Sequence, residues 1–398
     1  MPMNLLINRL STASLSFLQF FLPDAKQISF AGQGSARKLC EHVTRLGNKK
    51  VLLVTDKILM DLGVGDVVLN TIKEQGGEVV VYDGVLPDPT VSMVEQALKL
   101  QKQHACQAVI AMGGGSSIDT AKAVSAAASN GDIRKLLGIL KVKQAPIPLF
   151  AIPTTSGTGS EVSLAAVISD DQTHEKTVMA DPKIVPKAVA LDPELLVGMP
   201  PSVTASTAMD ALSHALETYL SRWTNNSVQE YSGAAVKMIF QWLPTAYQDG
   251  KNLQARESLS LASYYAGLSL NDASVGNVHA LAHQIGGKYG IPHGVAISAV
   301  MPHVLTFSKA AIVKPLARLA DLIGVTAAGD SEALKADKFI EALLELQKSV
   351  SMPATLEKIQ ASDVDELAKQ AVKEAWLYPV PKVMGKAEAK QMINAVRG

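Results

Sequence analysis

Short apolar runs alternate with longer helical stretches through the first half of the chain. The runs are rich in Val, Ile, Leu and Ala, as expected of strands buried on both faces of a parallel sheet. They cover residues 51–56, 78–83, 108–112, 148–152 and 188–191. Helical segments separate them, including one near residues 91–103 that follows a proline-containing loop. Alternation of this kind predicts a mostly parallel sheet with right-handed crossovers.

Two local patterns break this alternation. Residues 163–168 and 177–180 are apolar and flank the polar segment 169–176, which predicts a hairpin-like excursion. Further on, Pro200, Pro201 and Ser202 form the clearest boundary in the chain, because the serine can cap a helix that begins there.

After this boundary the pattern is helical throughout. Several segments rich in Ala and Leu have helical spacing, and no strand alternation is convincing. The predicted helices lie near residues 202–221, 227–243, 252–270, 273–287, 293–308, 310–323, 331–350 and 363–375. The sequence therefore predicts an α/β domain at residues 1–199 and an all-α domain at residues 200–398.

Composition narrows the class of protein without changing this division. The 398 residues are 47% hydrophobic and 19% charged, which is ordinary for a compact enzyme. Lys+Arg and Asp+Glu are both 37, so no basic excess favours nucleic acid or an anionic membrane as a partner. Cys40 and Cys106 make no disulfide framework and are typical of a reducing compartment.

The N-terminal stretch is apolar but interrupted. Asn8, Arg9 and Gln19 break the runs 5–7 and 15–22, and no run is long enough to span a bilayer. We interpret the stretch as an ordered extension and entry strand, with a secretory signal as the alternative, and expect a cytoplasmic protein.

Histidines gather in the second half of the chain. Five of the eight fall in one window: His214, His279, His283, His293 and His303. Asp210 and His214 are four residues apart, which places them on the same face of an apolar helix. A buried carboxylate needs a compensating partner, and a carboxylate with imidazoles suits a divalent transition metal. The alternative is a hydrogen bond on a helix surface.

A second set of features lies at the carboxyl ends of the predicted strands, where such sheets bind ligands. Residues 113–115 are Gly-Gly-Gly, followed by a helix whose positive end suits an anion such as a pyrophosphate. The loop 154–160 offers hydroxyls and glycines, and Asp56 would bind an adenosine ribose and repel a 2′-phosphate, which favours NAD over NADP. Each feature also has a purely structural interpretation. The glycines can form an ordinary turn, the loop 154–160 can be a solvated loop, and Asp56 can be a helix N-cap.

Four motifs, in this order, resemble those of the iron-containing (group III) alcohol dehydrogenase family. They are GGGSSIDTAK at 113–122, PTTSGTGSE at 153–161, DALSHALE at 210–217 and HALAHQIGGKYGIPHG at 279–294. The resemblance runs from about residue 30 to the C-terminus. It implies a Rossmann-like dinucleotide-binding domain at 1–199 and an all-helical metal-binding and substrate domain at 200–398.

The resemblance also assigns the metal ligands. They would be Asp210, His214, His279 and His293, leaving His283 unligated and suited to proton relay. Spacing alone does not choose between His279 and His283. Fe²⁺ is the metal that the family implies, and Zn²⁺ is the alternative because it binds the same ligands more tightly. His303 lies outside the motifs and is interpreted as a packing or surface residue.

On the nucleotide side the resemblance implies a longer set of contacts. The expected NAD contacts are Asp56, Asp88, Gly114, Gly115, Ser116, Ser117, Asp119, Thr154, Thr155, Thr158, Lys176 and Leu195. Asp88 departs from the family pattern, in which many members carry Asn in an Asn-Pro-Thr turn.

The function implied is the NAD-dependent interconversion of a primary aliphatic alcohol and its aldehyde. Ala165 and Ala166 stand where relatives that act on small diols carry Asn, which favours simple alcohols over polyols. A homodimer or higher homo-oligomer is expected, with a small-molecule partner and neither nucleic acid nor membrane. The alternatives are a glycerol or other polyol dehydrogenase, a metal-dependent lyase or hydrolase on the same fold, and a non-catalytic nucleotide-binding scaffold.

Overall fold

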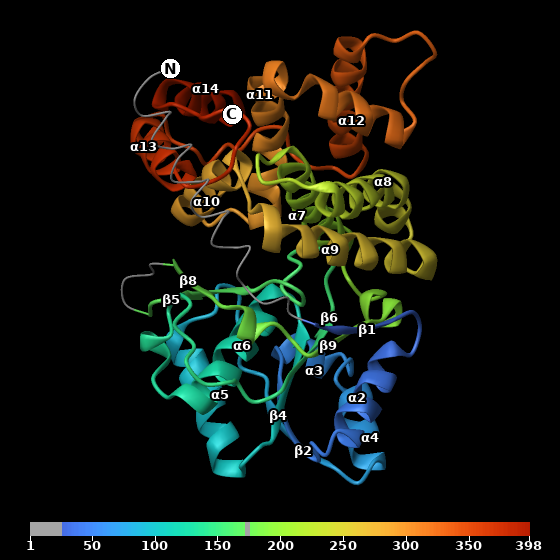
Figure 1. The fold of residues 1–398 in the computed structure, drawn as a ribbon, viewed down its shortest axis with the longest axis vertical. Coiled ribbons are helices and arrows are strands. Elements are labelled where there is room, and N and C mark those ends of the chain that lie inside the picture. The colour runs from blue at the N-terminus through green and yellow to red at the C-terminus, as the bar shows by residue number, and fades with distance from the viewer. Residues whose placement is uncertain (1–25, 172–175) are drawn as a thin grey trace. The chain divides into compact units, whose positions relative to one another are not determined.

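The computed structural model describes residues 26–171 and 176–398 and divides them into two compact units (Figure 1). One unit ends at Met199 and the other runs over Pro200–Gly398. The apolar runs 5–7 and 15–22 of the N-terminal stretch lie outside the described residues.

The first unit is built on a six-stranded sheet in which every strand pairs in parallel with its neighbours. Its strands, in spatial order, are β1 (Ile28–Ala31), β9 (Ala188–Leu191), β6 (Leu149–Pro153), β4 (Ala108–Gly113), β2 (Lys50–Val54) and β3 (Glu78–Tyr82). The central strands β4 and β6 are buried at every residue, as their unbroken apolar sequence requires.

Helices cover both faces of this sheet. They are α2 (Ser35–Arg45), α3 (Lys57–Asp61), α4 (Asp66–Glu74), α5 (Val91–His104) and α6 (Gly115–Asn130). Leu52 packs in the core that includes residues of α5 and α6, and the adjacent Leu53 packs in the core that includes residues of α2 and α4. Successive side chains of a strand point to opposite faces, so the two cores are the two sides of one sheet.

A small second sheet extends this unit. Its strands, in order, are β5 (Gly138–Ile139), β8 (Lys176–Ala180) and β7 (Ala165–Ser169). β7 and β8 pair antiparallel, with Ala165 opposite Ala180, so the predicted hairpin-like excursion is confirmed. Part of the polar segment between them, residues 172–175, is not described.

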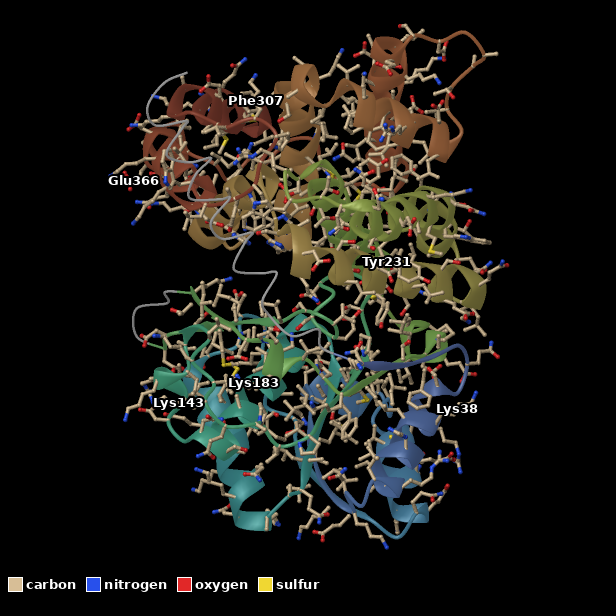
Figure 2. All side chains as sticks on the ribbon, viewed as in Figure 1. Lys38, Lys143, Lys183, Tyr231, Phe307 and Glu366 are labelled. Carbon is tan, nitrogen blue, oxygen red and sulfur yellow. The ribbon has the colours of Figure 1, made fainter. Side chains whose placement is uncertain are left out.

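The second unit, described throughout residues 200–398, contains helices and no strand. The helices are α7 (Pro201–Leu220), α8 (Asn226–Gln248), α9 (Leu253–Ala273), α10 (Asn277–Tyr289), α11 (His293–Ile323), α12 (Glu332–Ser349), α13 (Val364–Ala375) and α14 (Lys386–Val396). They enclose one large apolar core, and charged side chains such as Glu366 point outward (Figure 2). An α/β unit followed by an all-helical unit confirms the predicted fold class.

The predicted helices 293–308 and 310–323 both lie within α11, where a kink at Ile312, whose φ of −128° is not helical, separates two helical segments. One helix of this unit was missed. Helix α14 was not predicted, although Ala389, Met392, Ile393 and Val396 fall on one face and are buried.

Among the described residues, α11 is the helix that could cross a membrane by length and composition. Its most apolar window is 61% buried inside the protein. Residues such as Ile297, Val300 and Met301 belong to the helical core, which accounts for their apolar character.

Candidate metal centre and nucleotide site

Asp210 and His214 lie on one face of α7, inside the helical core. Asp210 is 4% exposed and His214 is 6% exposed, and the neighbouring Met209 and Leu212 are core residues. An ionised carboxylate buried on this face of α7 is shielded from water. Its charge must therefore be compensated by cations or hydrogen-bond donors nearby.

Two other histidines reach α7 from α10 and α11, and a tight turn joins these two helices. Gly290 ends α10 with a left-handed φ of 62°, and the chain re-enters a helix at His293. A Cβ on Gly294 would lie 2.0 Å from the carbonyl oxygen of Ser206 in α7, so only glycine lets α11 begin so close to that helix. His279, near the start of α10, and His293 therefore both reach the face that carries Asp210.

Three imidazoles direct the same ring nitrogen toward one carboxylate oxygen. Asp210 Oδ1 lies 3.7 Å from His214 Nε2, 3.7 Å from His279 Nε2 and 3.3 Å from His293 Nε2. Ligand atoms about 2.0–2.2 Å from a tetrahedral metal stand about 3.4 Å apart, so these spacings suit a shared cation. Three possible ligand atoms, one from each of Asp210, His279 and His293, all lie within 4.8 Å of one another. His214 falls outside this mutual set, and its ring stacks on His279 with centroids 4.7 Å apart.

Two ligand atoms of this site have no hydrogen-bond partner in the described chain. Asp210 Oδ1 and His279 Nε2 are buried, and neither finds a hydrogen-bond partner within the described chain. Buried polar atoms without partners are costly, and a cation between these two atoms would satisfy both. The residues present therefore fit a divalent transition metal.

The buried side chains of this site differ in protonation state. Burial alone would raise the pKa of Asp210, but His214 and His293 hold it well below its usual range. Burial lowers the pKa of His214 to about 4, so this ring is neutral near pH 7. Burial would also lower the pKa of His279, but Glu217 and Asp210 outweigh it and raise the pKa to about 9. His279 must therefore lose a proton when a metal binds.

Glu217 was given no role by the sequence, yet it contacts this site directly. Its Oε2 lies 2.5 Å from His279 Nδ1, and its side chain is 8% exposed. The spacing of Asp210, His214 and Glu217 along α7 (i, i+4, i+7) was the available signal, since it places all three on one helix face.

His283 lies beside the metal ligands and is held by a separate set of side chains. Its ring stacks on that of His293, with centroids 5.3 Å apart, and its side chain is 43% exposed. Glu374 Oε1 lies 2.6 Å from His283 Nδ1 and also accepts a hydrogen bond from Tyr378 Oη, and Gln284 donates to Glu374 Oε2. Burial lowers the pKa of His283, while Glu374 opposes that effect. Sequence spacing offered no signal for Glu374, which lies on α13.

His303 stands apart from these residues. It belongs to no metal-ligand set found in the described part of the chain, and burial lowers its pKa. This is consistent with its interpretation as a packing residue.

In the α/β unit, the glycine turn and the threonine loop meet at one edge of the sheet. Thr154 N donates to the carbonyl oxygen of Gly113, which joins the ends of β6 and β4. A Cβ on Gly114 would lie 3.3 Å from Thr155 Oγ1, and a Cβ on Gly115 would lie 2.8 Å from Thr158 Cγ2. The two motifs therefore pack against each other with no room for larger side chains.

The first turn of α6 adds an anion-binding surface to this edge. Gly114 is its N-cap, and no described side chain caps the helix or places a carboxylate in its first turn. The N–H groups of Gly115, Ser116 and Ser117 open the helix, where the dipole favours negative charge. This arrangement suits a pyrophosphate.

Three other residues expected to contact the nucleotide, Asp56, Asp88 and Leu195, lie outside the glycine turn and the threonine loop. Asp56 Oδ1 accepts from Leu59 N and so caps α3, as the purely structural interpretation expected, and its Oδ2 points near Gly113. Asp88 has a left-handed φ of 58° and forms an ion pair with Lys176, both exposed. Leu195 is partly buried against the α2 and α4 side of the sheet.

A buried ion cluster anchors the threonine loop to α6. Lys122 Nζ donates to the carbonyl oxygens of Ser163 and Ala165 and to Ser160 Oγ. Asp119 accepts from Ser160 Oγ and from Val167 N. Both oxygens of Asp119 are thus used within the protein, so this residue shapes the loop.

Glu161 offers a stability test of this cluster. Burial raises its pKa to about 7, with backbone hydrogen bonds and Lys122 opposing. Its contribution to folding is full below pH 4.5, its unfolded value, and is lost as pH rises through about 7. Glu161→Gln is therefore expected to gain up to about 3 kcal/mol over the parent between pH 5 and pH 8, since one pKa unit is about 1.4 kcal/mol. Thermal melts of both proteins at pH 5 and pH 8 measure the stability gained by the variant. The same stability difference at both pH values would contradict a raised pKa for Glu161.

The comparisons with known proteins follow the same two units. The family model "Iron-containing alcohol dehydrogenase" matches residues 27–193, and "Fe-containing alcohol dehydrogenase family, C-terminal" matches residues 204–396. The NAD-dependent methanol dehydrogenase of Bacillus methanolicus is 36% identical over 378 residues, 94% of this chain and 98% of that protein.

Two further proteins, one matched by sequence and one by structure, are similar to this chain over most of its length. The 1,3-propanediol dehydrogenase of Klebsiella pneumoniae is 35% identical over 360 residues, 89% of this chain and 93% of that protein. A solved 1,3-propanediol oxidoreductase superposes with a TM-score of 0.91 at 34% identity, covering 93% of this chain and 98% of that one. This chain therefore belongs to the iron-containing alcohol dehydrogenase family.

Proposed function

We propose that this chain interconverts a primary aliphatic alcohol and its aldehyde with NAD(H), using a divalent metal held by Asp210, His214, His279 and His293. The observation that carries the proposal is the convergence of three Nε2 atoms on Asp210 Oδ1, an oxygen that has no hydrogen-bond partner within the described chain. When bound, the metal supplies a Lewis acid that lowers the pKa of an alcohol hydroxyl and polarises an aldehyde carbonyl.

The chain's own residues would provide the remaining steps. His283 Nδ1 donates to Glu374, which leaves His283 Nε2 as the atom that takes the alcohol proton and returns it in the reverse reaction. The lowered pKa of His283 keeps this nitrogen unprotonated near neutral pH. The first turn of α6 and the loop 154–160 would hold the NAD pyrophosphate and nicotinamide, with Asp56 at the adenosine ribose.

The finer assignments belong to the same proposal. Residues 1–199 would form the nucleotide-binding domain and residues 200–398 the metal-binding and substrate domain. Fe²⁺ is the proposed metal and Zn²⁺ its rival, because both accept one carboxylate with three imidazoles. We further propose a cytoplasmic homodimer or larger homo-oligomer.

The experiment that tests the function uses the unmodified chain purified without oxygen. Elemental analysis is expected to find about one divalent metal per chain, and NADH formation from a primary alcohol is expected to exceed NADPH formation. Chelation should abolish turnover and metal replacement should restore it. A metal-dependent hydrolase or lyase would instead need no nicotinamide cofactor, so full metal content without alcohol-dependent NADH formation would reject the proposal.

Substrate preference is expected to favour simple alcohols. Ala165 and Ala166 open β7 with methyl groups, and Ala166 is buried in the apolar core beside α5 and α6, so these two positions offer no polar side chain to a second hydroxyl. We expect kcat/KM for 1-propanol and 1-butanol to exceed that for 1,2-propanediol by about tenfold, the effect of one unpaired hydroxyl. Steady-state kinetics with the three substrates decide the point, and a preference for the diol would favour the polyol dehydrogenase alternative.

A further inference from the structure

We propose that Glu217 is a positioning residue that fixes the tautomer of His279 and thereby sets how tightly the helical unit retains its metal. The inference rests on the proposed function, because it takes His279 as a metal ligand. Glu217 is neither a proposed metal ligand nor the proposed proton acceptor.

The carboxylate of Glu217 contacts α10 through both of its oxygens. Glu217 Oε2 lies 2.5 Å from His279 Nδ1, and Glu217 Oε1 accepts a hydrogen bond from Val278 N at 2.7 Å. Both oxygens of one buried side chain are therefore committed to two consecutive residues of α10. Apolar side chains, among them Leu216 and Val380, line the adjoining cavity and limit the competition from water.

The contact with Glu217 decides which nitrogen of His279 carries the proton. An ionised carboxylate can only accept hydrogen bonds, so the proton between Glu217 and His279 belongs to Nδ1 of the imidazole. A neutral His279 then presents an unprotonated Nε2, which is the nitrogen 3.7 Å from Asp210 Oδ1. Carboxylates that hold the far nitrogen of a liganding histidine in this way orient the ring and make it more basic.

Glu217 also holds the start of α10. Its N-cap is Gly276, which has no side chain to offer, and Glu217 reaches across from α7 to satisfy the N–H of Val278. A Cβ on Gly276 would lie 2.9 Å from Glu217 Oε1 and 3.4 Å from Val380 Cγ1. The backbone at Gly276 thus fits closely against the carboxylate, and a methyl group there would displace it.

Glu217→Gln separates this proposal from a purely structural role. Glutamine has nearly the same shape and can still accept from Val278 N through its single carbonyl oxygen. Its amide group would then donate to His279 Nδ1 and favour the tautomer that carries its proton on Nε2, which cannot bind a metal. A residue that only anchors α10 would keep the bond to Val278 N on this change, and the protein would keep both its stability and its metal.

The test compares full-length Glu217→Gln and Gly276→Ala with the parent chain and with Gly287→Ala. Gly287 lies on the same helix, and a Cβ there would meet no heavy atom of the described chain within 4 Å, so it is the matched control. Each protein is loaded with Zn²⁺, and zinc content and its release into excess chelator are followed, with thermal melts of the metal-free proteins alongside.

Glu217→Gln is expected to bind zinc about 10–100-fold more weakly and release it faster, as for other residues that support liganding histidines. Gly276→Ala should move in the same direction, and Gly287→Ala should match the parent. Parent-like zinc retention in both Glu217→Gln and Gly276→Ala would overturn the proposal, and Gly276→Ala alone decides it if Glu217→Gln does not fold. Failure of the proposed function looks different: the parent itself would hold no stoichiometric zinc, or Asp210→Asn would retain it.

Discussion

Replacing Asp210 by asparagine is expected to strip the metal from the protein and to lower kcat/KM for alcohol oxidation by at least about a thousandfold. Asp210 Oδ1 is the oxygen that three Nε2 atoms face, and asparagine removes its charge while keeping its shape. Metal Lewis-acid catalysis supplies several kcal/mol, and about 4 kcal/mol corresponds to a thousandfold in rate. Metal analysis and steady-state kinetics measure the two effects.

Asp365→Asn is the matched control in the same unit. Asp365 pairs with Lys386 and Lys390 at the surface, where such pairs contribute little. This variant should keep parent-like metal content and turnover. If Asp210→Asn also keeps both, the metal does not bind where we place it.

Replacing Gly113 by alanine is expected to weaken NAD binding by about 10–100-fold. Gly113 has φ of 146°, a conformation that L side chains rarely adopt, and a Cβ there would lie 2.4 Å from Ser117 Oγ. Strain of this kind costs about 1–3 kcal/mol, and every 1.4 kcal/mol is tenfold in affinity. The glycine turn would have to shift, and the first N–H groups of α6 would shift with it. Titration of NADH fluorescence measures the dissociation constant.

Gly198→Ala provides the comparison within the same unit. A Cβ at Gly198 meets no atom of the described chain within 4 Å, and its φ is not left-handed, so NADH affinity should equal that of the parent. Equal affinity in Gly113→Ala as well would show that the turn does not hold the nucleotide.

Much of the fold could be predicted because the signals are local. β4 was expected at 108–112 and spans Ala108–Gly113, since a strand buried on both faces needs an unbroken apolar run. The change at Pro200 and Pro201 from alternating strands to helices marked the start of α7, because proline is favoured at the first helical position. Ser202, expected to cap this helix, instead lies inside α7, whose N-cap is Pro200 and which has no side-chain cap.

Helices α11 and α14 were harder to predict because packing decided them. Pro302 and Pro315 lie inside α11, where the intrinsic preference is for a break, yet the kink falls at Ile312, between them, and buried residues flank it on both sides. Helix α14 is short and mixes polar with apolar residues, so its apolar face becomes a strong signal only against the helical core.

The sequence by itself determined which residue types are available for chemistry, since the spacing of Asp210 and His214 places them on one helix face. It did not determine which of His279 and His283 faces Asp210, because the two are one turn apart and equally placed on α10. The tertiary structure decided this: Glu217 from α7 holds Nδ1 of His279, and Glu374 from α13 holds Nδ1 of His283. Each partner is more than 60 positions away along the chain, and only packing of the helices brings a carboxylate to each ring.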